Sequence, residues 1–258
     1  MRLLDAQIGK FIMAKTLILI PSRMSATRLP GKPLLTINNL SIISHVFKKA
    51  EEANIGEVVV ATEDKEILDD VKKNGGRAIL TGSNHKTGTD RIFEAYEKLN
   101  IKDIDFILNL QGDEPNIDKN DIINLNSFMI NNNSEIGTLA AEIKNDKMLN
   151  DQNVVKVITE LKLKKDNFPK ALNFTRDSFS KNNQNIYHHI GIYSYKTSIL
   201  KKFVSLNQTS SEKQNRLEQL RALDNNLKIS VALANFSPIG VDTKEDYLAI
   251  KKIMEYKS

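Results

Sequence analysis

Three cationic side chains fall close together in a proline-rich segment near the start of the sequence. Arg23, Arg28 and Lys32 lie within ten positions, directly after Ser22, among three prolines and one glycine. The segment follows the apolar run 16–20, and open α/β sheets bind ligands beyond the carboxyl ends of their strands. Three cations there can neutralise a triphosphate and stabilise a departing pyrophosphate. The segment is not a P-loop, since the second glycine and the Ser/Thr after the lysine are missing. An ordinary solvated basic turn is the alternative.

Two acidic segments lie far apart in the sequence. Asp113 and Glu114 follow an apolar run at 105–110, and Asp242 stands in the segment 240–246 (GVDTKED) before the last expected helix. Mg²⁺ is usually bound by one or two carboxylates together with phosphate oxygens and water. Asp113 is therefore the first candidate metal ligand, and Asp242 can face the same ion. A Gly-Asp turn and a capping box are the alternatives for the two segments.

Three further segments carry polar side chains that could contact a ligand. Residues 85–91 (HKTGTDR) lead into a helix, where backbone N–H groups favour polar ligands, although a simple cap is the alternative. His188 and His189 are adjacent on an expected strand, so only one of them can face a given pocket. Glu218 and Gln219 lie on an expected helix, where a solvated face is the default interpretation.

The elements that must position these side chains alternate between strand and helix in the first half of the chain. Such alternation predicts a doubly wound α/β fold with a mixed, mostly parallel sheet. After about residue 135 the pattern becomes richer in strands, which predicts a smaller strand-rich lobe. Strands are expected over 16–20, 57–62, 78–80, 105–110, 136–143, 154–161, 171–174, 187–195 and 228–234. Helices are expected over 42–50, 65–73, 89–99, 121–129, 198–206, 212–223 and 245–256. Loops are expected over 144–153 and 180–185.

Composition limits the classes of function. The 258 residues include no cysteine, which excludes disulfides, thiolate catalysis and Cys-ligated metals. The net charge is +5, but the lysines are spread along the chain and mixed with acidic residues. The sequence therefore argues against a nucleic-acid-binding surface. Apolar runs are too short for a membrane span, and we expect a cytoplasmic protein. Residues 1–14 are expected to be an N-terminal extension, and residues 15–258 a single domain with a nucleotide-binding half (15–135) and a second half (136–258).

Seven segments in register resemble the 3-deoxy-manno-octulosonate cytidylyltransferase family, from about Thr16 to the C-terminus. They are 22–34 (SRMSATRLPGKPL), 85–91 (HKTGTDR), 111–115 (QGDEP), 153–157 (NVVKV), 189–195 (HIGIYSY), 217–221 (LEQLR) and 240–246 (GVDTKED). The resemblance implies a nucleotide-diphospho-sugar transferase-like fold and a homodimer that joins through second-half strands. The implied activity transfers CMP from CTP to 3-deoxy-D-manno-octulosonate (Kdo) for lipopolysaccharide biosynthesis.

The resemblance also implies roles for individual residues. The catalytic residues would be Arg23, Lys32, Asp113 and Asp242. Mg²⁺ would be bound by Asp113 and Asp242. CTP would be bound by Ser22, Arg23, Arg28, Lys32, Thr81, Ser83, Arg91, Gln111 and Asp113. The sugar would be bound by Gln111, Arg176, His189, Tyr193, Glu218 and Gln219.

The sequence departs from the family pattern mainly on the sugar side. His188 stands where the family usually has Arg, and the stretch after Arg176 lacks the usual Ile-Pro. The changes on the nucleotide side, IPSR for IPAR and TDR for TER, are mild. A related acidic acceptor, 8-amino-Kdo or a nonulosonic acid, therefore stays open. A glycosyltransferase or a non-catalytic nucleotide-binding module would be a more distant alternative.

Overall fold

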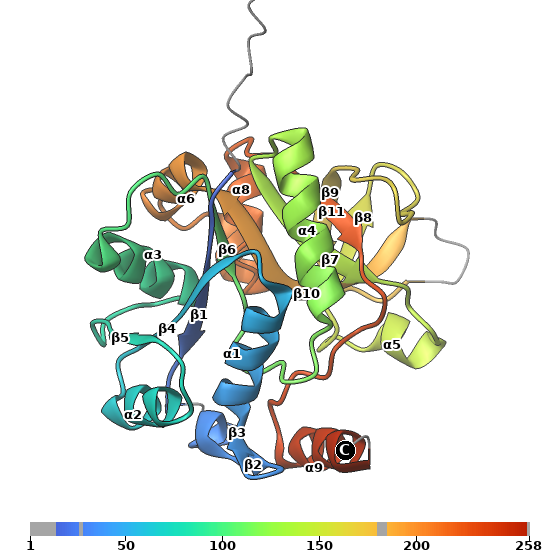
Figure 1. Cartoon of the computed structure of the whole chain (residues 1–258). Helices are drawn as coiled ribbons and strands as arrows, with labels where there is room; N and C mark the ends of the chain where they lie inside the picture. Colours follow the sequence, from blue (N-terminus) through green and yellow to red (C-terminus); the bar gives the residue numbers. More distant parts are fainter. Residues whose placement is uncertain (1–13, 26–27, 180–184, 257–258) are drawn as a thin grey trace, which may run out of the picture.

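The structure is a computed structural model that describes residues 14–25, 28–179 and 185–256, and Figure 1 shows helices flanking one large twisted sheet. The strands of this sheet are β1 (Thr16–Ser22), β4 (Gly56–Thr62), β5 (Ala78–Leu80), β6 (Phe106–Asn109), β7 (Ile136–Ala141), β8 (Lys156–Thr159), β9 (Ala171–Thr175), β10 (Ile186–Lys196) and β11 (Ile229–Leu233). A separate hairpin consists of β2 (Thr36–Ile37) and β3 (Leu40–Ser41). The helices are η1 (Lys32–Leu34, 3-10), α1 (Ile42–Ala53), α2 (Lys65–Lys73), α3 (Gly88–Leu99), α4 (Lys119–Asn132), α5 (Asp146–Asn150), α6 (Thr197–Val204), α7 (Ser210–Asn215), α8 (Leu220–Asp224) and α9 (Lys244–Tyr256).

The order of the strands creates a crevice at the carboxyl end of β1. The central path runs β11-β7-β10-β6-β1-β4-β5, with β8 and β9 attached beyond β10. Strand β1 pairs in parallel with β4 on one side and with β6 on the other, and β10 is antiparallel to β6 and β7. The chain thus reverses its direction of winding at β1, and α/β sheets bind ligands at such a switch point. The predicted doubly wound, mostly parallel sheet and its antiparallel strand-rich part are confirmed.

The core consists of two apolar layers, one on each face of the sheet. Along β1, Ile18 and Ile20 belong to the layer under α1 and α4, whereas Leu17 and Leu19 belong to the layer under α3 and α6. All four side chains are fully buried. A strand covered on both faces needs an unbroken apolar run, which explains the pattern of residues 16–20.

Local capping signals fix several helix ends as predicted. The Ser41 side chain accepts a hydrogen bond from the Ser44 N–H and begins α1. Helix α2 covers the predicted residues and is followed by Gly75, whose φ of 85° is in the left-handed region that glycine tolerates. None of the helices in the described ranges is long and apolar enough to cross a membrane.

Two predictions about the second half are wrong. The expected loop 144–153 contains α5, because the Asn145 side chain caps it by accepting from the Met148 N–H. The expected helix 212–223 is two short helices, α7 and α8, because Arg216 adopts a left-handed conformation (φ 53°) and ends α7. The hairpin β2–β3 was not predicted. Residues 1–13 of the expected extension and 180–184 of the second expected loop lie outside the described residues.

Gly56 stands where β4 begins its pairing with β1, opposite Thr16. A Cβ at this position would lie 1.8 Å from the Thr16 carbonyl oxygen, so the backbones must separate to admit one. We expect Gly56→Ala to lower the free energy of unfolding by about 1–3 kcal/mol, measured by urea denaturation. Gly240→Ala is the matched control, because a Cβ there meets no described atom within 4 Å. Equal stability of the two variants would contradict this explanation.

Candidate functional site

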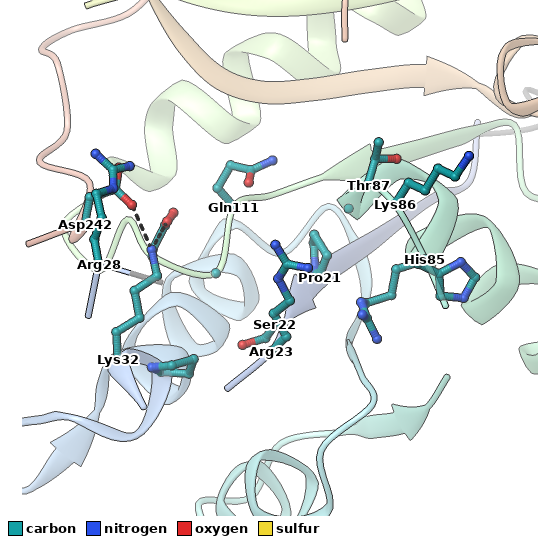
Figure 2. A pocket seen from close by; sticks show the side chains of 15 residues that line it. Pro21, Ser22, Arg23, Arg28, Lys32, His85, Lys86, Thr87, Gln111 and Asp242 are labelled. Carbon is teal, nitrogen blue, oxygen red and sulfur yellow. Dashed lines mark hydrogen bonds and ion pairs between the residues drawn. The ribbon is translucent and has the colours of Figure 1, made fainter. Parts of the chain in front are cut away.

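A cavity of about 380 Å³ opens at the carboxyl ends of β1 and β6. Its walls come from four parts of the chain: the cationic loop after β1, the start of α3, the acidic segment after β6 and the acidic segment before α9. Figure 2 shows the Lys32 side chain reaching toward Asp242, with His85, Lys86 and Thr87 on the opposite wall. The residues that line the cavity are Pro21, Ser22, Arg23, Arg28, Lys32, Pro33, His85, Lys86, Thr87, Gly88, Arg91, Gln111, Gly112, Asp113 and Asp242.

One ammonium group joins the two acidic segments at one end of this cavity. Lys32 Nζ lies 2.7 Å from Asp113 Oδ2, 3.1 Å from Asp242 Oδ1 and 2.8 Å from the Val241 carbonyl oxygen. Arg28 Nη2 lies 2.8 Å from the other Asp242 oxygen. Burial alone would lower the pKa of Lys32, but Asp113 and Asp242 outweigh it and hold the pKa above its ordinary value. The two carboxylates therefore share one cation, although 128 residues separate them in the sequence.

Backbone contacts hold the segment of Asp242 against the end of β6. The Val241 N–H donates to the Asp113 carbonyl at 2.9 Å, and the Ile239 N–H donates to Asn116 Oδ1 at 3.0 Å. The α9 cap uses different side chains: Asp246 accepts from the Thr243 N–H, and Thr243 Oγ1 accepts from the Asp246 N–H. The capping box therefore does not use the side chain of Asp242, which faces the cavity and pairs with Lys32 and Arg28.

The acidic residue next to Asp113 has a different environment. Burial, with the neighbouring charge of Asp113, raises the pKa of Glu114 to about 8. Its Oε2 atom is buried and accepts no hydrogen bond from the described residues. Asp113 points into the cavity and Glu114 does not line it, so the carboxylate that can meet a ligand is Asp113.

The wall made by α3 combines a cap with a buried ion pair. Thr87 Oγ1 accepts from the Asp90 N–H at 3.1 Å and caps the helix. Arg91 is only 3% exposed and donates to Glu63 at 2.5 Å and to Thr81 Oγ1 at 2.7 Å. Arg91 thus lines the cavity with its charge already paired, and it fixes the ends of β4 and β5 beneath the cavity.

Most of the residues predicted for CTP lie together. Those that line the cavity are Ser22, Arg23, Arg28, Lys32, Arg91, Gln111 and Asp113. In the described part of the chain, Thr81 and Ser83 do not line it, because Thr81 lies beneath Arg91 and Ser83 is exposed to solvent. The predicted residues omitted His85, Lys86 and Thr87, which do line it. The signal for them was present, since all three stand in the segment before the helix start.

Most of the residues predicted for the sugar lie beyond the cavity. Of that set, the described cavity lining includes Gln111 alone. A Cβ at Gly191 would lie 3.3 Å from Gln111 Cγ, so Gln111 rests on β10 where the strand has no side chain. His189 and Tyr193 flank this glycine on the same face of β10, with ring centroids 5.4 Å apart. His189 and Tyr193, which were predicted to bind the sugar, thus flank the glycine that Gln111 contacts, and Gln111 lines the cavity.

The other predicted sugar residues are engaged by the protein itself. Burial and the charge of His188 lower the pKa of His189 to about 3, so this side chain is neutral in the folded protein. Its Nε2 lies 3.1 Å from Thr138 Oγ1. Arg176 donates to the carbonyl oxygens of Gln152 and Asn153, each at 3.1 Å.

Glu218 and Gln219 lie in the turn between α7 and α8. Glu218 Oε2 accepts from Thr89 Oγ1 at 2.9 Å, and the Glu218 side chain is 27% exposed. Gln219 is half-buried. The fully solvated helix face that the sequence suggested by default is therefore wrong.

The two carboxylates at the cavity are fewer ligands than a metal site made of protein side chains alone would need. In the described ranges, no group of three or more His, Cys, Asp or Glu side chains could hold a metal ion. Mg²⁺ bound to a nucleotide needs only one or two carboxylates, because phosphate oxygens and water complete its octahedron. The Lys32 ammonium already occupies the position between Asp113 and Asp242 where a cation is electrostatically favoured.

Comparisons with known proteins agree with one another. A family model described as cytidylyltransferase matches residues 17–229. A 3-deoxy-manno-octulosonate cytidylyltransferase of Thermodesulfovibrio yellowstonii is 43% identical over 93% of this chain and 98% of that protein. The protein of the same name from Nitrobacter hamburgensis is 42% identical over 93% of each chain.

Solved structures extend the agreement to the fold. A structure described as CMP:2-keto-3-deoxy-manno-octonic acid synthetase complexed with CTP superimposes with a TM-score of 0.86. It is 32% identical, and the match covers 95% of this chain and all of that one. A 4-diphosphocytidyl-2C-methyl-D-erythritol synthase from Anaerococcus prevotii, 11% identical with a TM-score of 0.63, shares the fold. The chain belongs to the 3-deoxy-manno-octulosonate cytidylyltransferase family.

Proposed function

We propose that this chain transfers CMP from CTP to Kdo, giving CMP-Kdo and pyrophosphate for lipopolysaccharide biosynthesis. Relatives at 42–43% identity carry the name of this activity, and the related solved structure is described as a complex with CTP. The observation in this chain that best supports the proposal is the Lys32 ammonium between Asp113 and Asp242, in a cavity that also holds Arg23. These charges complement a triphosphate that carries a divalent cation.

The reaction needs positioning and charge stabilisation rather than a covalent intermediate. The sugar's anomeric oxygen bonds to the α-phosphorus, while the bond from that phosphorus to the bridging oxygen breaks and its electrons leave with pyrophosphate. Arg23, Arg28 and Lys32 stand on the wall where the negative charge of pyrophosphate would grow. Because these cations line the cavity before the nucleotide arrives, they are at hand to stabilise that charge as it develops. The N-terminus of α3 at Thr87 and Gly88 presents N–H groups suited to an anion.

Asp113 and Asp242 fit a magnesium site in this proposal. Their oxygens surround a cation already, and two carboxylates suit Mg²⁺ bound to a nucleotide. Bound Mg²⁺ would neutralise charge on the α-phosphate and favour ionisation of the sugar hydroxyl. With nucleotide present, Lys32 would turn its donors from the carboxylates to phosphate oxygens, which leaves both carboxylates to the metal.

The acceptor half of the site would extend from Gln111 over β10. His189, neutral at physiological pH, can donate or accept a hydrogen bond but adds no positive charge for the sugar carboxylate. Rotation of Arg176 away from the carbonyls of Gln152 and Asn153 would present its guanidinium to that carboxylate. We propose Arg176, Tyr193, Glu218 and Gln219 as the remaining sugar contacts, and Thr81 and Ser83 as part of the nucleotide pocket.

We also propose that the protein is a cytoplasmic homodimer. In the described ranges β9 pairs along its length with β8 alone, apart from an isolated bridge between Lys170, just before β9, and Ser230 of β11. The apolar side chains of Leu172 in β9 and Leu161 just after β8 are 60% and 55% exposed. An edge strand with apolar neighbours is a surface that a second copy could cover. The cytoplasm is where CTP is available. The division into a nucleotide half (15–135) and a sugar half (136–258) follows the same proposal.

The acceptor can be decided by one panel of assays. We expect pyrophosphate release and a CMP-sugar product with CTP, Mg²⁺ and Kdo, and at least about tenfold lower kcat/KM with 8-amino-Kdo or a nonulosonic acid. Omission of Mg²⁺ with excess chelator should abolish turnover. A higher kcat/KM with another acidic sugar would show that this sugar, and not Kdo, is the acceptor. If no acceptor gave pyrophosphate, the proposed transferase activity would be refuted.

The proposed role of Asp113 predicts a large loss of rate. Asp113→Asn keeps the shape of the side chain but removes its charge, so turnover should fall at least about 100-fold. Asp103→Asn is the matched control, because Asp103 is exposed, precedes β6 at the opposite edge of the sheet and has a φ of 63° that Asn tolerates. Near-normal turnover of Asp113→Asn would remove Asp113 from the metal site.

The proposed role of Lys32 predicts an effect on the nucleotide rather than on the sugar. Lys32→Ala should raise KM for CTP at least about tenfold and leave KM for Kdo within about threefold, because a charged hydrogen bond to phosphate is lost. Lys48→Ala on the exposed face of α1 is the control for a lost positive charge. A selective rise in KM for Kdo would overturn the assignment of the cationic loop.

A further inference from the structure

A buried polar network lies behind the α3 wall of the cavity. Thr89 is 2% exposed, and its Oγ1 donates to Glu218 Oε2 at 2.9 Å. The second carboxylate oxygen, Glu218 Oε1, is buried, and in the described part of the chain it has no hydrogen-bond partner. A buried acceptor without a donor costs about 1–3 kcal/mol. Such an oxygen needs a structural or functional explanation, so the contacts that hold Glu218 are informative.

The charge opposite Glu218 is held rigidly. Arg221 Nη2 lies 3.7 Å from Glu218 Oε1, within ion-pair distance. The same guanidinium donates side-on to Glu212, with Nε and Nη2 at 2.8 and 2.6 Å from its two oxygens. Its Cζ also lies 4.9 Å from the centroid of the Phe203 ring. Arg221 can therefore balance the charge of Glu218, but its hydrogen bonds to Glu212 keep it from rotating to donate one to Glu218.

Glu212 is fixed in its turn by the start of α7. It forms a capping box with Thr209, in which each residue bonds to the backbone of the other. The left-handed Arg216 then reverses the chain, so that Glu218 projects from the α7–α8 turn toward α3. The break in the expected helix 212–223 is what brings this carboxylate to Thr89.

The network connects the two halves of the proposed site. Thr89 is two residues beyond Thr87, which caps α3 and lines the nucleotide cavity. Burial raises the pKa of Glu218, and the hydroxyls of Thr89 and Thr87 and the charge of Arg221 act against it. The Thr89 hydroxyl therefore favours the ionised carboxylate as well as its orientation.

We infer that Thr89 is a positioning residue for the acceptor: its hydroxyl holds the Glu218 carboxylate in the orientation in which this partly exposed side chain can contact the sugar. The inference rests on the proposed function, in which Glu218 contacts the sugar. It assigns a residue of the nucleotide half to recognition of the acceptor.

The test compares Thr89→Val with Thr89→Ser in steady-state kinetics with CTP, Mg²⁺ and Kdo. Valine keeps the β-branched shape and removes the donor, so KM for Kdo should rise about tenfold to a hundredfold, while KM for CTP stays within about twofold. Serine keeps the hydroxyl and should restore KM for Kdo to within about threefold of the parent. If the extra methyl group of valine prevents folding, Thr89→Ala serves instead, because it also removes the hydroxyl and should raise KM for Kdo by a similar factor.

The outcomes separate this inference from the proposed function. If the parent chain gives no CMP-Kdo, the proposed function fails and the inference falls with it. If the parent turns over and both donor-free variants keep KM for Kdo within about twofold, only the role of Thr89 is overturned. Equal rises in both KM values, or a serine variant as impaired as valine, would show a general structural role and also overturn it.

Discussion

Two carboxylates that face one another near the bottom of a cavity repel unless a cation lies between them, and the rest of this structure is arranged around that constraint. In the folded chain the cation is the ammonium of Lys32, held between Asp113 and Asp242. Three distant segments, the loop after β1, the end of β6 and the approach to α9, must therefore meet. In the proposed function, the like charges that oppose folding would become the binding site for a counter-ion that arrives with a substrate.

The sheet brings these segments together without any long-range signal in the sequence. Because β1 lies between β4 and β6, the loops that follow β1 and β6 leave the same edge side by side. The hydrogen bond from the Val241 N–H to the Asp113 carbonyl then fixes the third segment. A small apolar cluster of Ile37, Ile42, Val241 and Ile250 buries the base of this joint. Charge pairing at the top and apolar burial beneath thus support the same geometry.

The parts of the fold that the sequence predicts well are those with strong local patterns. The apolar run of β1 and the Ser41 cap of α1 determine their elements within a few residues, so most of the cavity lining follows from strand ends. The errors arise where a single residue decides the chain direction. Arg216 enters the left-handed region without being glycine, and Asn145 caps a helix inside a polar tract. Neither choice can be predicted from apolar periodicity, because one depends on a polar cap and the other on the backbone conformation of a single residue.

A close contact between the cavity and β10 is made at a glycine. Gly191 gives Gln111 room to lie on the strand, and Gln111 is followed two residues later by Asp113. A Cβ at Gly191 would lie 3.3 Å from Gln111 Cγ, so a larger side chain there would press on the segment that carries Gln111 and Asp113. The close approach of this segment to β10 therefore depends on the absence of one methyl group.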